Sequence, residues 1–259
     1  MDAVDIRSRF EAVGVVRLPG AFAAEQATAM RKAIWRHAEL QAGLRPGDPA
    51  SWAGSPVLNW QGVRRDPALR PLADNQSVRD ALDVIFGAGG WQRPRVGAQI
   101  LFSLPEAGPW VLPDAWHMDC GFEHATWPVR SVKLFAFFGE VGPRGGGTLL
   151  LPGTHRLVDR YRAGLPAPAG AGQQNWRPFM RHHPWLARLL DGGGRPDHGR
   201  DLVGEAGEID GVPVQIVELT GSPGDVVVAH LHVFHSRSPN TGPVPRLMLG
   251  KEIRRAGET

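Results

Sequence analysis

The chain has 259 residues, of which 42% are hydrophobic and 21% charged, and its formal net charge is only +3. This length and composition suit one domain, residues 1–259, and the weak charge argues against the basic surface of a nucleic-acid-binding protein. The single cysteine, Cys120, excludes an internal disulfide and a thiolate-rich zinc site.

No apolar run in the sequence approaches the length needed to cross a bilayer, and the first ten residues lack the apolar stretch of a secretory signal. We therefore expect a soluble, cytoplasmic protein. Its expected partner is a small-molecule substrate, with no role for nucleic acid or membrane, and the sequence leaves the oligomeric state open.

The first ninety residues are expected to be mostly helical. Helical periodicity and strong helix formers predict helices over residues 5–13 and 24–41, with a strand over 14–22 between them. Residues 44–55 are rich in proline and glycine and predict a loop, and residues 77–90 predict a short helix that ends in glycine.

From residue 96 the pattern changes to short strands that are rich in β-branched and aromatic residues. A mainly β core with helical cladding, built as a two-sheet barrel or sandwich, follows from strands after a helical opening. The predicted strands cover residues 96–104, 115–122, 129–141, 147–155, 212–220, 224–236 and 246–253.

A long insertion over residues 156–212 interrupts the predicted strands. It contains glycine- and proline-rich pieces and one amphipathic helical pattern at residues 175–190, which includes Trp176. Because long insertions in compact domains often serve as lids or binding loops, we expect this one to be an active-site lid.

His117 and Asp119 stand two residues apart in the predicted strand 115–122, so their side chains should share one face. A carboxylate that faces the interior is costly unless it is paired or bound to a cation, which suggests a metal site. A third ligand should come from residues 224–236. His230, His232 and His235 all qualify, and spacing alone does not choose between them.

Three motifs together resemble the phytanoyl-CoA dioxygenase family of Fe(II)/2-oxoglutarate oxygenases: HMD at residues 117–119, GGTLLLPGTH at 146–155, and GDVVVAHLHVFHSRSPN with Arg246 beyond it. In that family the third motif is a histidine followed five residues later by asparagine and eleven later by arginine. His235, Asn240 and Arg246 match this spacing. The resemblance implies a double-stranded β-helix core, of the jelly-roll or cupin-like type.

By this resemblance His117, Asp119 and His235 bind Fe(II) as two imidazoles and one carboxylate, which leaves coordination positions for a cosubstrate and O2. The cosubstrate is 2-oxoglutarate, whose far carboxylate would bind Arg246, a permanently charged bidentate donor. Gln99, Phe137 and Thr148 are expected to line its pocket. The chain departs from the family at Arg237, where a hydroxyl side chain often contacts the cosubstrate.

The implied activity is hydroxylation of a C–H bond of a small organic substrate, such as a natural-product intermediate, with release of succinate and CO2. Aromatic side chains near the expected mouth suggest an apolar or ring-containing substrate, and the candidates are Trp116, Phe122 and Trp127. The alternatives are a cupin-like metal hydrolase and a non-catalytic ligand-binding scaffold; Arg246 argues against the first, and the intact ligand set against the second.

Overall fold

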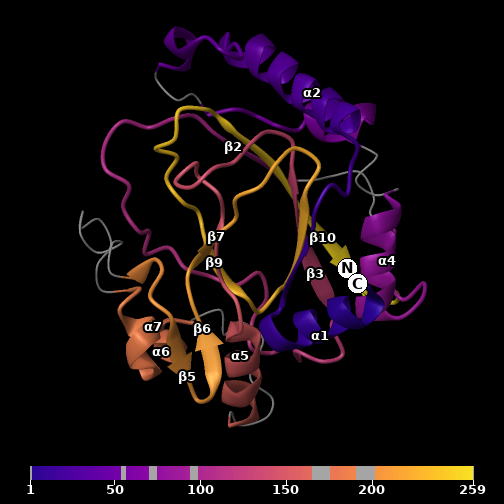
Figure 1. Ribbon diagram of the computed structural model, residues 1–259, viewed down its shortest axis with the longest axis vertical. Coiled ribbons are helices and arrows are strands. Elements are labelled where there is room, and N and C mark those ends of the chain that lie inside the picture. The colour runs from indigo at the N-terminus through magenta and orange to yellow at the C-terminus, as the bar shows by residue number, and fades with distance from the viewer. Residues whose placement is uncertain are drawn as a thin grey trace.

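A computed structural model describes residues 2–53, 57–69, 75–93, 99–164, 176–190 and 202–258. Two antiparallel sheets form the core (Figure 1). The larger has the strand order β1 (Val15–Leu18), β8 (Val226–His230), β3 (Ser131–Phe137), β10 (Arg246–Arg254) and β2 (Gln99–Ser103). The smaller has the order β7 (Val217–Glu218), β4 (Leu149–Leu151) and β9 (Phe234–Ser236), and β5 (Gly207–Ile209) pairs with β6 (Val212–Val214).

Three helices cover the outer face of the larger sheet: α1 (Ala3–Val13), α2 (Ala24–Ala42) and α4 (Gln76–Phe86). Their ends follow the local sequence, because the Asp2 side chain caps the amide of Asp5 and Asn75 caps that of Val78. Short 3-10 turns occupy Pro49–Trp52, Val63–Arg65 and Pro67–Leu69. The smaller sheet is covered instead by α5 (Thr154–Ala163), α6 (Arg177–His182) and α7 (Pro184–Ala187) (Figure 1).

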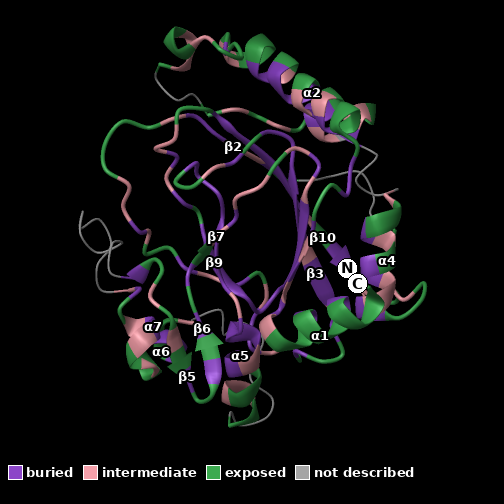
Figure 2. Ribbon diagram, viewed as in Figure 1, coloured by how far each residue is buried: buried purple, intermediate pink, exposed green. Residues whose placement is uncertain are grey.

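The central strands are buried on both faces because helices lie on one side and the smaller sheet on the other (Figure 2). In β3, Val132 and Leu134 pack outward against the helical layer, whereas Phe135 and Phe137 pack inward against Met248 and the smaller sheet. The inner face of β3, β10 and β2 therefore forms one wall of the space between the sheets.

The fold class predicted from the sequence is confirmed: two antiparallel sheets with helical cladding form a jelly-roll core. The helices predicted near residues 5–13, 24–41 and 77–90 are present. No helix among the described residues is long and apolar enough to cross a membrane.

Several predicted elements were wrong in detail. Residues 115–122 form no strand, only an isolated bridge between His117 and His235. The segments 224–236 and 212–220 each break into two strands that join different sheets, and His155 lies in the first turn of α5 rather than at the end of a strand. The single helix predicted over 175–190 is two helices, because Pro184 has no amide hydrogen to continue the first.

The predicted insertion, residues 156–212, lies partly outside the described residues, at 165–175 and 191–201. Its described parts are ordered, and they build an apolar core beneath the smaller sheet. This core contains side chains of α6, α7 and β6, among them Phe179, Leu186 and Val212, packed with Phe234 of β9. The described parts of the insertion therefore contribute to the core of the domain.

Candidate metal centre

The side chains of His117, Asp119 and His235 converge, although His235 follows His117 by 118 residues in the sequence. One potential ligand atom from each lies within 4.8 Å of the others. The loop around His117 runs antiparallel to β9, and the amide of each histidine donates to the carbonyl of the other, at 2.9 and 2.8 Å. The amide of Asp119 donates to the carbonyl of Leu231 at 3.2 Å. Backbone bonds to β9 and to the turn before it thus hold both candidate ligands of the HMD motif.

Each imidazole is oriented by the carbonyl two residues before it. The Nδ1 of His117 lies 3.2 Å from the Ala115 carbonyl, and that of His235 lies 3.0 Å from the Val233 carbonyl. A carbonyl only accepts, so Nδ1 carries the hydrogen in each ring and Nε2 keeps a free lone pair. This is the arrangement that metal-bound histidines adopt. The residues present therefore fit a divalent metal such as iron.

The electrostatics of the site favour a charged Asp119 carboxylate and a neutral His117 imidazole. Burial raises the pKa of Asp119, but the nearby His235 and Lys133 outweigh it and lower that pKa well below its usual range. Burial, together with His235, lowers the pKa of His117. Both shifts favour the protonation states that bind a metal cation.

Arg246 begins β10 and lies on the inner face of the sheet, directly opposite Ser103 of β2. Both are 4% exposed. Its Nη1 donates to the carbonyl of Gly146, but the Arg246 Nε and the Ser103 Oγ have no hydrogen-bond partner among the described residues. Burial, followed by the charge of Arg237, lowers the pKa of Arg246 to about 10, so the guanidinium is charged at neutral pH. Unpaired buried donors beside a cation suit an anionic ligand.

The other residues predicted for the cosubstrate pocket are distributed along this wall. Phe137 pairs with Met248 and is fully buried between the sheets, and Thr148 is buried just before β4. Gln99 pairs with Gly250, at the opposite end of β2 from Ser103, and is exposed. It therefore lies away from Arg246.

The hydroxyls near the third motif contact protein groups. The Ser236 Oγ donates to the carbonyl of Ala115, and the Ser238 Oγ accepts from the Trp110 indole. The Arg237 side chain is 69% exposed and lies 3.8 Å from Glu106. Its departure from the family pattern therefore places an arginine toward solvent.

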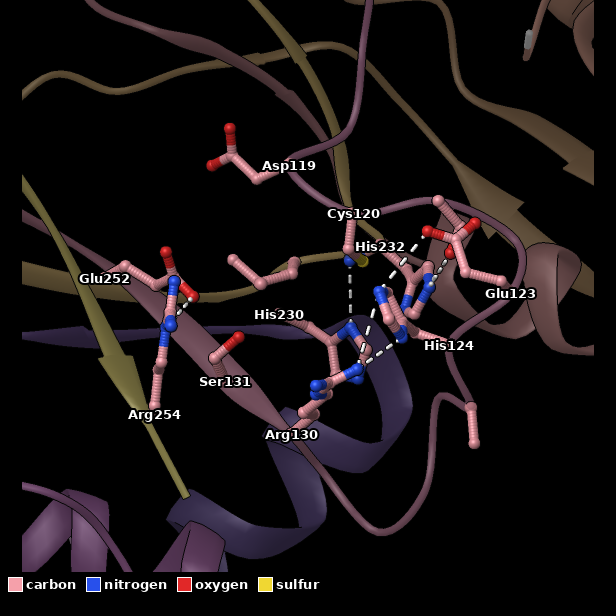
Figure 3. A pocket seen from close by; sticks show the side chains of 13 residues that line it. Asp119, Cys120, Glu123, His124, Arg130, Ser131, His230, His232, Glu252 and Arg254 are labelled. Atoms are coloured by element: carbon pink, nitrogen blue, oxygen red, sulfur yellow. Dashed lines mark hydrogen bonds and ion pairs between the residues drawn. The ribbon is translucent and has the colours of Figure 1, made fainter. Parts of the chain in front are cut away.

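Two cavities border Asp119. The first, of about 510 Å³, also touches His117 and is lined by Trp116, Trp176 and Arg177. The second, of about 250 Å³, is markedly polar (Figure 3). The Glu252–Arg254 pair lies on one side of it, and Glu123 and His124 lie on the other, with Arg130 hydrogen-bonded to His124.

The aromatic residues proposed to meet the substrate have mixed positions. Trp116 is buried but lines the larger cavity. Phe122 packs in the apolar core against Tyr161 and Phe179, and Trp127 packs on Phe10 of α1; neither lines the two cavities beside Asp119.

The structure adds polar groups that sequence reasoning missed, chiefly Glu123, Arg130 and Lys133. Lys133 was detectable only as a lone cation within an apolar strand.

The three other buried histidines do not join the metal group. His230 and His232 are less than 4% exposed, as is His155, and their tilted rings lie in a row, with centroids 5.2 and 5.3 Å apart, on the side of α1 and Thr126. Of the three histidines in the third motif, only His235 is grouped with His117 and Asp119.

The fold and site define a class: a jelly-roll protein whose sheets enclose a His-x-Asp…His group, with a buried arginine on the facing strand. A family model for phytanoyl-CoA dioxygenase (PhyH) matches residues 10–248. The chain belongs to the phytanoyl-CoA dioxygenase family, as its motifs indicated.

No curated protein matches the sequence significantly. Among solved structures, AviO1 from Streptomyces viridochromogenes Tue57 is similar at 17% identity and a TM-score of 0.60, over 100% of this chain and 97% of that one. EctD from S. alaskensis with bound Fe has 18% identity and a TM-score of 0.59, over 100% and 78%. The epimerase SnoN, in complex with Fe3+, alpha ketoglutarate and nogalamycin RO, has 17% identity and a TM-score of 0.55, and the match covers 98% of this chain and 84% of that one. At these identities the likeness shows a shared fold.

Proposed function

We propose that the protein is an Fe(II)- and 2-oxoglutarate-dependent dioxygenase that hydroxylates a C–H bond of a small organic substrate. One observation carries this: the ligand atoms of His117, Asp119 and His235 meet within 4.8 Å, and the Nδ1 atom of each histidine lies at a backbone carbonyl, which leaves Nε2 to bind a metal. Two imidazoles and one carboxylate with open positions are the ligand set of non-haem iron(II) oxygenases. The family and the metal-bound proteins of the same fold support the choice of iron.

In this proposal each part of the site has a separate task. His117, Asp119 and His235 hold the metal, and Arg246 with Ser103 binds the far carboxylate of 2-oxoglutarate. Phe137 and Thr148 are candidates for the wall of its cavity. When bound, Fe(II) and 2-oxoglutarate would supply the electrons that activate O2; 2-oxoglutarate would be oxidised to succinate and CO2 with one oxygen atom, and the other would enter the substrate C–H bond. The apolar residues around Phe137 exclude water from the ion pair with Arg246, which strengthens it.

The cavities beside Asp119 support a substrate with both polar and apolar parts. Trp116 and Trp176 line one cavity, and Glu123 and Arg130 line the other. A natural-product intermediate fits this mixed lining. Similar folds occur in an epimerase and a carbocyclase from nogalamycin biosynthesis, so the outcome after C–H oxidation depends on how the substrate is held. We place the enzyme in the cytoplasm, where a reducing environment maintains Fe(II).

The insertion is proposed to cover one side of the site. Trp176, which precedes α6, has its ring centroid 6.4 Å from that of His117, and together with Arg177 it lines the larger cavity. Substitution of Trp176 should therefore alter substrate binding while leaving the metal ligands intact.

Anaerobic addition of Fe(II) and then 2-oxoglutarate tests the proposal. We expect the weak visible absorption of the metal–keto-acid chelate and, with O2, release of succinate. Arg246→Met should weaken 2-oxoglutarate binding roughly 30- to 150-fold, since a lost charged hydrogen bond costs about 2–3 kcal/mol. Arg36→Met is the matched control, because that arginine is exposed on α2, outside the larger sheet, and its loss should leave the affinity unchanged. Absence of both the absorption band and succinate in the unaltered protein would remove the proposal and favour a hydrolase or a binding protein.

A further inference from the structure

Lys133 is a cation on the inner face of a central strand. It lies in the middle of β3, between β10 and β8, and its side chain is only 17% exposed. The chain has two other lysines, Lys32 and Lys251. An ammonium group in such a position is costly unless it is paired. Its partner is the metal-ligand candidate Asp119, with Nζ 3.1 Å from Oδ2.

This contact makes the two oxygens of Asp119 different. The Oδ1 atom lies 3.6 Å from the Nε2 of His235 and so faces the imidazoles, whereas Oδ2 faces Lys133. A carboxylate can bind a metal through one oxygen or both. With Oδ2 held by an ammonium group, only Oδ1 is directed at the metal position.

The neighbouring strand leaves a path for the lysine stem. Gly250 of β10 pairs with Phe135 of β3 and with Gln99 of β2. A Cβ at Gly250 would lie 3.2 Å from the Cε of Lys133 and 3.5 Å from the Oε1 of Gln99. The first distance is shorter than almost all Cβ contacts in proteins. Because residue 250 has no side chain, the side chain of Lys133 can extend over β10 on the inner face of the sheet.

We propose that Lys133 is a positioning residue that makes Asp119 bind the metal through Oδ1 alone. This rests on the proposed function, because it concerns the same metal. A carboxylate that binds through both oxygens occupies an additional coordination position. By holding Oδ2, Lys133 keeps that position available to the two-oxygen chelate of 2-oxoglutarate.

The test uses Co(II), whose visible spectrum reports coordination without turnover. Lys133→Met, Lys133→Arg and the control Lys251→Met are compared; Lys251 is on the adjacent strand and points to the opposite face. In Lys133→Met, Oδ2 is free to join the metal. We therefore expect an altered Co(II) spectrum before 2-oxoglutarate is added, and 2-oxoglutarate binding about tenfold weaker. Lys133→Arg should restore most of both properties, and Lys251→Met should match the unaltered protein.

Three outcomes would overturn the assignment. An unchanged Co(II) spectrum and unchanged 2-oxoglutarate affinity in Lys133→Met would show that the lysine does not control Asp119. An unchanged Co(II) spectrum with weaker 2-oxoglutarate binding would mean that Lys133 contacts the keto acid directly. Loss of Co(II) binding in a variant that keeps its circular dichroism would make the lysine a requirement for metal binding itself. If the unaltered protein binds neither Co(II) nor 2-oxoglutarate, the proposed function fails first, which is a separate result.

Discussion

The buried imidazoles of His155, His230 and His232 lie outside the candidate metal centre. Burial lowers their pKa values to about 3, 4 and 3, compared with an ordinary value of 6.5. Each has one nitrogen close to a backbone carbonyl, of Glu11, Thr126 and Gly121 in turn. These rings therefore act as uncharged packing groups beside α1.

Acidification should destabilise the fold through these histidines. Because the folded-state pKa is lowered, the unfolded chain binds more protons below pH 6.5, so stability is lost as the pH falls from about 6.5 toward about 4. Each such histidine contributes a slope of about 1.4 kcal/mol per pH unit within that window. Urea unfolding of the metal-free protein at several pH values measures the slope.

His232→Gln provides the variant for this test, and His182→Gln, an exposed histidine of α6, provides its control. The pH dependence of the free energy of unfolding should become less steep in His232→Gln and remain unchanged in His182→Gln. A slope that is the same in both would show that buried His232 does not control the acid sensitivity.

At the scale of elements, the break between β8 and β9 decides how the site is assembled. β8 belongs to the larger sheet and β9 to the smaller, and residues 231–233 connect them without extended pairing. The amide of Val233 donates to the carbonyl of His230, which closes the turn. In an unbroken strand, His235 would belong to the larger sheet, and alternation would fix the face to which its side chain points. The turn instead places His235 in the smaller sheet, which faces β10.

Gly14 supports this turn from the end of α1. It has φ of +73°, and the amide of His230 donates to its carbonyl at 2.8 Å. A Cβ there would lie 2.7 Å from the Nδ1 of His155 and 2.8 Å from Val233. Gly14→Ala should therefore cost about 2–4 kcal/mol, from left-handed strain plus overpacking.

Gly43→Ala is the matched control, because Gly43 ends α2 with φ of +67° and has no atom within 4 Å of the added Cβ. It should cost only the left-handed strain, about 1–2 kcal/mol. Chemical denaturation gives both values. Equal costs at the two positions would contradict the close packing around Gly14.

At the scale of the whole molecule, the candidate metal centre connects separate layers. Asp119 and His117 come from the loop before β3, His235 from the smaller sheet, and Lys133 from the larger sheet. A metal that binds only the folded protein should stabilise it. At a concentration 100 times its dissociation constant, the gain is about 2.7 kcal/mol.

Thermal or urea unfolding with and without Mn(II) or Co(II) measures this gain. Asp119→Ala should be stabilised far less by the same metal concentration, because one of three ligands is missing. If Asp119→Ala gained as much stability as the unaltered protein, the metal would be binding elsewhere.

The sequence by itself determined much of the chemistry. The helical opening, the change to short strands at residue 96 and the spacing of His235, Asn240 and Arg246 are local patterns, and they led to the jelly-roll class and the family. The resemblance also gave the candidate ligand set, since only His235 matched the family spacing. Local patterns suffice here because period and spacing are properties of neighbouring residues.

Only the tertiary structure decided where strands end and which side chains meet across layers. It broke residues 224–236 between two sheets, replaced the predicted strand around His117 by a loop bonded to β9, and placed Phe122 in the core. It also brought Lys133 to Asp119 and Ser103 to Arg246. These contacts depend on register and on the packing of two sheets, which residues close in sequence do not encode.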